Sequence, residues 1–315
     1  MRYGFGVDLG GTTVKLAYFN SDGYLLDKWE IPTRTMNNGE YILADIAASI
    51  RSYLDERLIP DTRVLGIGIG VPGPVDTEGT VHGCDNLGWG TFNVQKALSQ
   101  LTGFPVMVGN DANVAALGEC WKGGGQGYSD LVMVTMGTGV GGGIVLGDKP
   151  LYGTHGAAGE LGHMVINREE TEKCGCGKCG CVEQYCSATG VVRLAKRYLS
   201  ENNMPSLLRS CSPLTCKDVF DAGNRGDQAA KDILQKFYSL LGEFLANVCV
   251  VLDPQVIVLG GGVSKAGDVL LQGVAPHFRR FAFRGVADTP ITLAKLGNDA
   301  GAYGAFRLAL QAFYE

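Results

Sequence analysis

The sequence predicts an α/β protein of two lobes with a cleft between them. A pattern of strand, glycine turn and strand occurs at residues 3–19 and again at residues 131–146. Each copy is followed by a helical pattern and then by a short, apolar strand, as expected for a strand buried in a parallel sheet. The length of 315 residues is typical of two domains or one large one. A duplicated α/β plan is most simply built as two lobes, and ligand clefts form between such lobes.

The composition is that of an ordinary globular protein and excludes several functional classes. Hydrophobic residues make up 45% and charged residues 19% of the chain, which disfavours disorder. A net charge of −5 gives no general affinity for nucleic acid or anionic lipid. Charged residues interrupt both the longest apolar stretch, at Leu240–Gly262, and the first apolar run, at Asp8. We therefore expect neither a membrane span nor a signal peptide, and a protein of the cytoplasm.

The first half divides into three strands, a helix and a fourth strand. The expected strands cover residues 3–9, 13–19, 24–31 and 64–71. They are apolar and β-prone, and turn residues such as Asn20–Gly23 and Pro72–Pro74 separate or end them. The helix runs from about Gly39 to Leu58, because isoleucine and leucine residues recur in it every four positions.

The second half repeats this plan. Its expected strands cover residues 131–136, 144–146 and 256–259. A glycine turn at Gly137–Gly143 joins the first two strands, and a long apolar helix at Ile233–Val251 precedes the third. The likeness between the halves lies in the pattern of elements and not in residue identity.

The glycine turns are candidates for binding phosphate. Asp8-Leu-Gly-Gly-Thr12 follows the first strand, so its free N–H groups could face an anion while Asp8 holds a hydrated Mg²⁺. A plain hairpin turn is the alternative. Gly137–Gly143 formally fits the dinucleotide fingerprint, but a strand and not a helix follows it, which disfavours that interpretation. Two such turns could grip the phosphates of one nucleotide, and Gly260–Gly262 could approach its base or ribose.

Asp111 is the candidate catalytic carboxylate. It follows the apolar run Pro105–Gly109 and precedes the helical pattern Val114–Cys120, at a junction of strand and helix. A carboxylate in this position could accept a proton from a substrate hydroxyl during phosphoryl transfer, which depends mainly on positioning and charge stabilisation. The alternative is a helix cap, for which Asn110 and Asp111 are both suited.

Clustered cysteines predict a metal site. Of the ten cysteines, five crowd into residues 174–186 and the rest are scattered, as expected for reduced thiols. Such a cluster in a large cytoplasmic chain is more typical of metal binding than of disulfides. Three thiolates from Cys174–Cys181 and the imidazole of His163 would bind a structural, tetrahedral Zn²⁺. That run holds four cysteines, and Cys179 is the surplus thiol that leaves the ligand set ambiguous; an accidental thiol-rich loop is the alternative.

Two carboxylates stand close to this cluster in the sequence. Glu160 lies three residues before His163, in a glycine-rich stretch, and Glu183 lies two residues after Cys181. An imidazole bound to zinc through one ring nitrogen can donate a hydrogen bond through the other. His163 could thereby link the metal to a bound polyol, with both carboxylates nearby. Solvated surface carboxylates are the alternative for both residues.

Together these motifs resemble the ROK family of sugar kinases and repressors, and most closely its bacterial glucokinases. The matching stretches are residues 8–12, 70–73, 110–113, 137–143, 156–163, 174–183 and 259–262. Each is modest alone, but the ordered set spans nearly the whole chain. The resemblance implies the actin-like ATPase fold, related to ribonuclease H, with one lobe formed by residues 1–111 and 300–315 and the other by residues 112–299. It also implies ATP-dependent phosphorylation of the 6-hydroxyl of a hexose, most simply glucose to glucose 6-phosphate, in glycolysis.

The resemblance assigns roles to individual residues. Asp111 is the catalytic base. The sugar contacts fall on Gly73, Asn110, Asp111, Glu160, His163 and Glu183. Contacts to Mg²⁺ and the ATP phosphates fall on Asp8, Gly10, Gly11, Thr12, Thr138 and Gly139, and contacts to adenosine on Gly260, Gly261 and Gly262. The zinc ligands fall on His163, Cys174, Cys176 and Cys181, which leaves Cys179 outside the set.

Within this family the substrate is the open point. Asn86-Leu-Gly-Trp89 resembles a stretch common in the glucokinases, which favours glucose, with N-acetylmannosamine or another hexose as the alternative. A sugar-sensing repressor is disfavoured, because the first expected strand begins at Tyr3 and leaves no room for a helix-turn-helix domain. The family tends to form homodimers, some of which pair into tetramers, and neither nucleic acid nor membrane is an expected partner.

Overall fold

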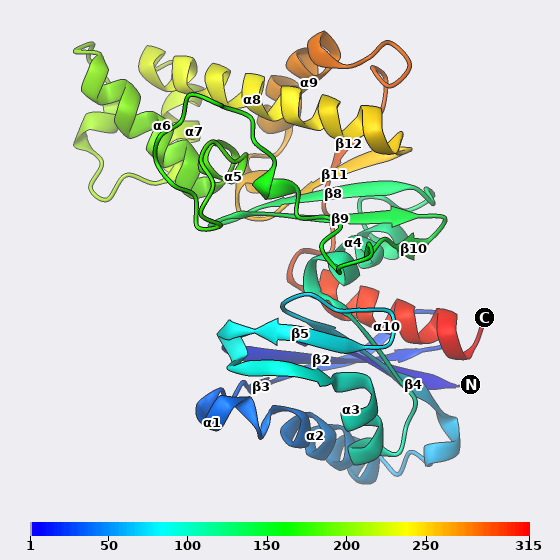
Figure 1. Ribbon diagram of the computed structural model, residues 1–315. Helices are drawn as coiled ribbons and strands as arrows, with labels where there is room; N and C mark the ends of the chain where they lie inside the picture. Colours follow the sequence, from blue (N-terminus) through cyan, green and yellow to red (C-terminus); the bar gives the residue numbers. More distant parts are fainter. Residues whose placement is uncertain (1) are drawn as a thin grey trace. The chain divides into compact units, whose positions relative to one another are not determined.

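The computed structural model describes residues 2–315, which form two compact units. Unit 1 contains the residues up to Ser129 together with Gly143–Gly159 and Lys295–Glu315. Unit 2 contains Asp130–Gly142 and Glu160–Ala294. The chain therefore passes between the units after residues 129, 142, 159 and 294. Figure 1 labels the elements of both units.

Unit 1 is built on a five-stranded mixed sheet. Its strands are β1 (Tyr3–Leu9), β2 (Thr13–Asn20), β3 (Leu25–Pro32), β4 (Val64–Val71) and β7 (Val106–Asn110). Their order is β3-β2-β1-β4-β7. Neighbouring pairs within β1–β3 are antiparallel, whereas β4 is parallel to both β1 and β7. The carboxyl ends of β1, β4 and β7 therefore meet at one edge of the sheet.

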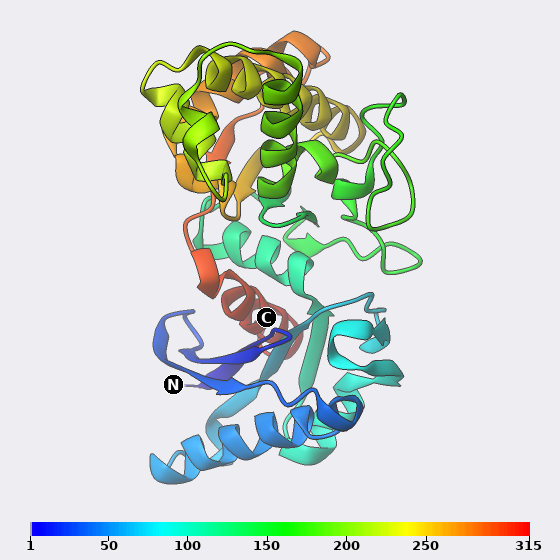
Figure 2. The ribbon, with the colours of Figure 1, turned by 90° about the vertical axis from the view of Figure 1, so that its left-hand side faces the viewer.

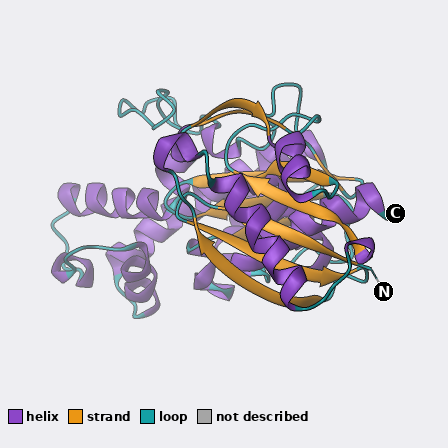
Figure 3. Cartoon of the chain, turned by 90° about the horizontal axis from the view of Figure 1, so that it is seen from below, coloured by secondary structure: helices purple, strands orange, loops and turns teal. Residues whose placement is uncertain are grey.

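Helices cover the two faces of this sheet (Figure 1), and Figure 3 shows, from below, helices lying over the strands of one face. The remaining elements of unit 1 are α1 (Met36–Gly39), α2 (Ile42–Glu56), the hairpin β5 (Thr80–Cys84) and β6 (Trp89–Asn93), α3 (Val94–Thr102), α4 (Asp111–Lys122), β10 (Lys149–Pro150) and α10 (Ala300–Phe313). One core packs large apolar side chains of β1 and β4 against α2 and α3. The C-terminal helix α10, red in Figures 1 and 2, packs beside the blue N-terminal strands on the other face.

The two faces differ because β1 and β4 alternate large residues with glycine. Phe5 of β1, Ile67 of β4 and the other large residues at every second position of these strands fill the core under α2 and α3. The glycines face α10 and let its backbone come very close: a Cβ added at Gly6 would lie 2.0 Å from the Ala302 carbonyl oxygen. At Gly68 the corresponding distance to the Ala305 carbonyl oxygen is 1.6 Å. Alternation at period two thus places a side-chain core on one face and a helix backbone on the other.

The second sheet repeats the strand order of the first. The order is β10-β9-β8-β11-β12, where β8 is Leu131–Met136, β9 is Val140–Leu146, β11 is Val256–Gly260 and β12 is Ile291–Leu293. β11 is parallel to both β8 and β12. Unit 2 also contains the helices α5 (Glu183–Cys186), α6 (Ala188–Glu201), α7 (Cys216–Asn224), α8 (Gln228–Leu252) and α9 (Asp268–Phe281). The expected duplication of the α/β plan is confirmed.

The structure corrects several expected boundaries. The glycine turn expected at residues 137–143 ends at Gly139, because Val140–Gly143 continue as strand β9. The helix expected from Gly39 begins at Ile42, after a left-handed bend at Asn37 and Asn38. The hairpin β5–β6, the short strands β10 and β12, and α9 were not expected. Within residues 2–315, no helix is long and apolar enough to cross a membrane.

We expect Gly68→Ala to destabilise unit 1 by about 3 kcal/mol or more, because the new methyl group would overlap the α10 backbone. Urea denaturation followed by circular dichroism measures the loss. Gly90→Ala is the matched control, since a Cβ there meets nothing within 4 Å, and we expect a change below about 0.5 kcal/mol. Equal losses in the two variants would contradict this account of the sheet.

Candidate functional site

The parallel strands of unit 1 bring several of the predicted site residues to one edge. Asp8 of β1 lies opposite Gly70 of β4, and Gly70 lies opposite Gly109 of β7. Asn110 and Asp111 follow immediately after Gly109, so the ends of β1 and β7 carry their polar residues to the same edge. In α/β sheets, ligands bind at the carboxyl ends of parallel strands.

Asn110 caps α4 and fixes the position of Asp111. The Asn110 side-chain oxygen accepts hydrogen bonds from the backbone N–H of Ala112 at 3.0 Å and of Asn113 at 3.2 Å. Its side-chain amide donates to the Gly73 carbonyl oxygen at 3.0 Å. Asp111 is the first residue of α4 and is half-buried. Asn110 is therefore the N-cap, and Asp111 Oδ1 also accepts from the Ala112 N–H at 2.8 Å. The Asp111 carboxylate lies at the positive end of the α4 dipole.

The first glycine turn is held by its own backbone and by Thr33. The Gly10 N–H donates to the Thr13 carbonyl oxygen at 3.0 Å, and the Thr33 hydroxyl donates to the Gly10 carbonyl oxygen at 2.7 Å. Gly11 and Thr12 at the tip are exposed. The turn therefore presents backbone to solvent beside Asp8, as a phosphate-binding turn requires.

Asp8 is a partly buried carboxylate with a nearby cation. Its side chain is 21% exposed, and Lys15 Nζ lies 3.4 Å from its Oδ2. Burial raises the pKa of Asp8, and the Lys15 ammonium acts in the opposite direction. A partly desolvated carboxylate gains from a cation beside it, so Asp8 is chemically suited to help bind a hard metal ion.

The second glycine turn, Gly137–Gly139, and a third one at Gly260–Gly262 lie side by side in unit 2. The Gly137 N–H donates to the Gly139 carbonyl oxygen at 2.9 Å, closing a tight turn after β8. A Cβ added at Gly261 would lie 2.5 Å from the carbonyl oxygen of Met136, the last residue of β8. Residues 260–262, at the end of β11, therefore lie next to the turn that follows β8.

Glu183 contacts the second turn and the cysteine cluster. Its Oε2 accepts from the Val140 N–H at 3.0 Å, and a Cβ added at Gly139 would lie 2.1 Å from the same oxygen. Its Oε1 accepts from the Cys174 thiol at 3.5 Å. Glycine at position 139 thus permits a carboxylate to pack directly on the turn. The structure therefore brings Glu183 to Gly139 of the second turn as well as to Cys174.

The cysteines and His163 form a compact four-ligand group. The ligand atoms of His163, Cys174, Cys176 and Cys181 all lie within 4.8 Å of one another. Cys176 Sγ is 3.6 Å from Cys181 Sγ, and Cys174 Sγ is 3.8 Å from His163 Nδ1. Tetrahedral Zn–S bonds of about 2.3 Å place two sulfurs about 3.8 Å apart, so this group fits zinc. None of the ten cysteines, which all lie within the described residues, forms a disulfide. Cys179 stands outside the group, and its thiol donates to the Thr171 carbonyl oxygen at 3.5 Å.

His163 uses its two ring nitrogens on different sides. Nδ1 faces the thiols, whereas Nε2 lies 3.8 Å from Glu160 Oε2. The Glu160 side chain is 65% exposed. The structure therefore brings Glu160 and His163 together, with Nε2 directed away from the thiols and able to donate a hydrogen bond.

A cavity of about 570 Å³ opens beside the second turn. Its lining residues are Thr138, Glu172, Ala188, Thr189, Val192, Arg193, Lys196, Arg197, Leu214 and Cys216. The Thr189 hydroxyl donates to the Thr138 carbonyl oxygen at 2.6 Å, which fixes the start of α6 against the turn. Apart from Thr138, sequence analysis did not predict these residues. No local motif marks them, because they come together from α6, α7 and the loop before Cys174.

A buried ion-pair cluster connects that loop to α6. The Glu170 side chain is 1% exposed and contacts Arg193 at 2.7 Å, Arg197 at 2.9 Å and the Tyr185 hydroxyl at 2.6 Å. These partners, Arg197 foremost, hold the pKa of Glu170 well below its ordinary value. Glu170 therefore fixes the two arginines of the cavity wall to the segment that carries the cysteines.

Glu170→Gln should lower the free energy of unfolding by about 2–3 kcal/mol at pH 7. The folded pKa is depressed, so this stability is present above the ordinary value of 4.5 and is lost as the pH falls below it. The difference between wild type and variant should therefore shrink near pH 3, as measured by urea titration at both pH values. Glu172→Gln is the control: this residue pairs with the same arginines but is exposed, so we expect less than about 1 kcal/mol at either pH. A Glu170→Gln effect independent of pH would contradict the assignment.

Comparison with known proteins matches nearly the whole chain to one family. The model of the ROK family matches residues 4–312. A glucokinase of Halalkalibacterium halodurans is 42% identical over 308 residues, covering 96% of this chain and 93% of the relative. Among solved structures, a ROK glucokinase from Streptomyces griseus in complex with glucose and AMPPNP is 34% identical, with a TM-score of 0.74. It covers 98% of this chain and 99% of its own. A ROK hexokinase from Thermus thermophilus is 32% identical, with a TM-score of 0.79 and coverage of 96% of each chain. The predicted actin-like ATPase fold is confirmed by these similarities.

Proposed function

Because the chain belongs to the ROK family, we propose that it is an ATP-dependent hexose kinase that converts glucose to glucose 6-phosphate. The similarity to a glucokinase along nearly the whole chain supports this, as does the similarity to a structure that holds glucose and AMPPNP. The observation that carries the proposal is the position of Asp111. It stands at the N-terminus of α4, fixed by the Asn110 cap, at the edge of the sheet where β1 places Asp8.

Asp111 is the proposed general base. The 6-hydroxyl oxygen attacks the γ-phosphorus of ATP, the bond between that phosphorus and the bridging oxygen breaks, and ADP leaves. The hydroxyl proton passes to the Asp111 carboxylate. Asn110 contributes by holding the turn: it joins the start of α4 to the Gly73 carbonyl oxygen at 3.0 Å. This fixed geometry supplies the positioning that phosphoryl transfer needs most.

The glycine turns are the proposed nucleotide contacts. The first turn, with Gly10, Gly11 and Thr12, and the second, with Thr138 and Gly139, offer backbone N–H groups to phosphate oxygens. Gly260–Gly262 would contact the adenosine, and the cavity of about 570 Å³ beside Thr138 would offer it space. Asp8 would help to hold Mg²⁺, which neutralises charge on the phosphates when bound.

The proposed sugar contacts are Gly73, Asn110, Asp111, Glu160, His163 and Glu183. Glu160 supports this role, because it is an exposed acceptor beside His163 Nε2. Glu183 has a different setting, since its two oxygens already contact Val140 and Cys174. We therefore propose that Glu183 aligns the second turn and the zinc loop as well as contacting sugar.

Zinc is the proposed ion of the four-ligand group, in a structural role. Four protein ligands leave no open coordination position for catalysis. The ion would hold His163 with its Nε2 directed toward Glu160, and would thereby order the sugar contacts. We further propose a homodimer or homotetramer in the cytoplasm, and the division into lobes of residues 1–111 with 300–315 and residues 112–299, on the resemblance to the family.

Release of ADP from Mg-ATP, measured with a panel of sugars, tests the proposed function. We expect turnover with glucose. Asp111→Asn should lower kcat by about 10² to 10⁴-fold while glucose affinity changes little, because the base acts on the chemical step. Asp288→Asn, an exposed residue in a loop, is the control and should keep wild-type kcat.

Other results of the panel have defined meanings. Preference for N-acetylmannosamine would replace glucose as the substrate and keep the mechanism. No turnover with any hexose, from folded protein, would overturn the kinase proposal. Equal losses of kcat and glucose affinity in Asp111→Asn would argue against its role as base.

Metal analysis tests the zinc site. We expect about one zinc ion per chain in the purified protein. Cys176→Ser should lose it and should also raise the KM for glucose, because His163 is no longer held. Cys179→Ser is the matched control from the same loop and should keep both the metal and the KM. Retention of zinc by Cys176→Ser with loss by Cys179→Ser would overturn the proposed ligand set.

A further inference from the structure

Glu119 of α4 is a buried carboxylate to which the proposed mechanism gives no role. Its exposed fraction is 0%. Its oxygens accept three backbone N–H groups, from Gly124 at 2.7 Å, from Lys295 at 2.9 Å and from Leu296 at 2.8 Å. A carboxylate is stable in a protein interior only with such charge-assisted hydrogen bonds. Through two of these bonds, Glu119 holds the backbone of Lys295 and Leu296 in one position.

That segment begins where the chain returns to unit 1. Lys295 and Leu296 are the first residues after the crossing that follows Ala294. They lead through a short 3-10 turn at Gly297–Asp299 into α10. Lys295, Gly297 and Asn298 are exposed, so few side chains pack on the segment. Among the hydrogen bonds that hold it, two are accepted by the carboxylate of the fully buried Glu119.

The same segment contacts Asp8 and its neighbour Lys15. The Asn298 carbonyl oxygen accepts from Lys15 Nζ at 3.2 Å, and Lys15 Nζ is 3.4 Å from Asp8 Oδ2. A Cβ added at Gly301 would lie 2.7 Å from the Asp8 carboxyl carbon, so the first turn of α10 packs directly on that carboxylate. The segment thus limits where Asp8 and Lys15 can lie.

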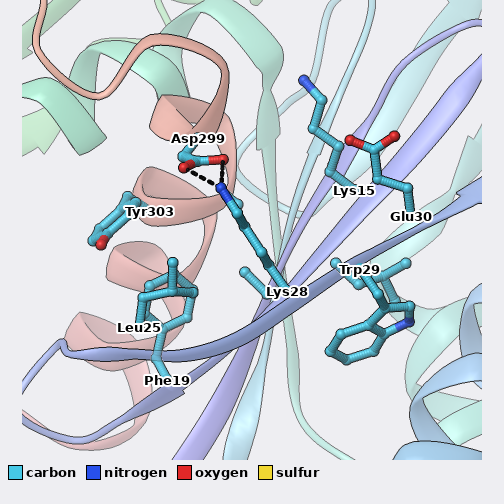
Figure 4. Close-up of a pocket in the computed structure, with 11 residues that line it drawn as sticks. Lys15, Phe19, Leu25, Lys28, Trp29, Glu30, Asp299 and Tyr303 are labelled. Carbon is cyan, nitrogen blue, oxygen red and sulfur yellow. Dashed lines mark hydrogen bonds and ion pairs between the residues drawn. The ribbon is translucent and has the colours of Figure 1, made fainter.

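Figure 4 shows the outer side of this arrangement. Lys28 of β3 reaches across to Asp299 at the start of α10, at 2.8 Å, and Lys15 and Glu30 project from neighbouring strands. These residues surround a cavity of about 190 Å³. The ion pair between Lys28 and Asp299 on this side is largely solvated, with side-chain exposures of 57% and 35%, so it contributes little. The buried contact with Glu119 is therefore the stronger anchor.

We propose that Glu119 is a positioning residue that holds the 295–301 segment so that Lys15 and Asp8 stay aligned at the first glycine turn. The inference rests on the proposed function, in which Asp8 and this turn bind Mg-ATP. A purely structural Glu119 would lower stability and leave nucleotide affinity unchanged. A positioning Glu119 would weaken the use of Mg-ATP in protein that remains folded, with little effect on glucose.

Glu119→Gln is the first variant. The glutamine keeps the shape but turns an NH₂ group toward backbone donors and removes the charge. We expect the KM for Mg-ATP to rise about tenfold or more, and the KM for glucose to change less than about twofold. Two measurements do not depend on turnover: Mg-AMPPNP should bind more weakly in calorimetry, and the Lys295 and Leu296 amides should exchange faster with deuterium.

Asp227→Asn is the matched control. The Asp227 carboxylate also accepts three hydrogen bonds, from Leu207 N–H at 2.6 Å, Ala230 N–H at 2.9 Å and the Ser206 hydroxyl at 3.1 Å. It caps α8 in unit 2, whereas Asp8 belongs to unit 1. We expect this variant to lower the melting temperature and to leave nucleotide affinity unchanged.

Lys15→Met tests the route from the segment to Asp8. Alone it should also weaken Mg-AMPPNP binding, and it serves as the test if Glu119→Gln does not fold. In the double variant the two effects should be less than additive, because both remove the same alignment. Additive effects, or unchanged nucleotide affinity in either folded single variant, would overturn the inference. A wild-type protein that binds Mg-AMPPNP but phosphorylates no hexose would overturn the proposed function and leave the binding tests of Glu119 valid.

Discussion

The close approach of α10 to the glycine face of the first sheet is the constraint on which unit 1 depends. An α-helix normally rests on the side chains of a sheet, but here its backbone lies against β1 and β4 themselves, at positions such as Gly6 and Gly68. That contact fixes the height of α10 above the strands. Because Asp8 shares the parity of these glycines, it also faces α10, and Gly301 leaves just enough space for its carboxylate.

The same geometry explains why chemistry gathers at one edge. Once β1, β4 and β7 are parallel and in register, their ends carry Asp8, the Gly73 turn and Asn110 outward together. Asn110 then begins α4 and leaves Asp111 in its first turn. The second sheet repeats the order of strands, so β8 and β11 bring the turns at Gly137 and Gly260 together in the same way. Because the two sheets share one strand order, each of them has an edge lined by glycine turns.

Much of this could be predicted from sequence because the signals are local. Apolar, β-prone residues mark the strands at residues 3–9 and 13–19, and the clustering of Cys174, Cys176 and Cys181 marks the metal loop. Even so, spacing alone left Cys179 as an equal candidate, and only the fold of the loop points its thiol at Thr171. The β5–β6 hairpin was missed because its strands are short and partly exposed, so hydrophobic pattern carries little information there.

Residues that act across long sequence separations left no such signal. Glu170 and Arg197 are far apart in the chain, and Glu119 and Lys295 are much farther apart. In each pair the buried glutamate carboxylate accepts a hydrogen bond from the other residue. In a sequence, a glutamate within a helix is most simply a solvated residue, and burial cannot be inferred from its neighbours. Burying a carboxylate costs free energy unless its partners are already in place. A buried carboxylate of this kind therefore selects one arrangement of its partners over similar ones. Glu119 does so for the segment that reaches Asp8, and Glu170 does so for the arginines that line the cavity near Thr138.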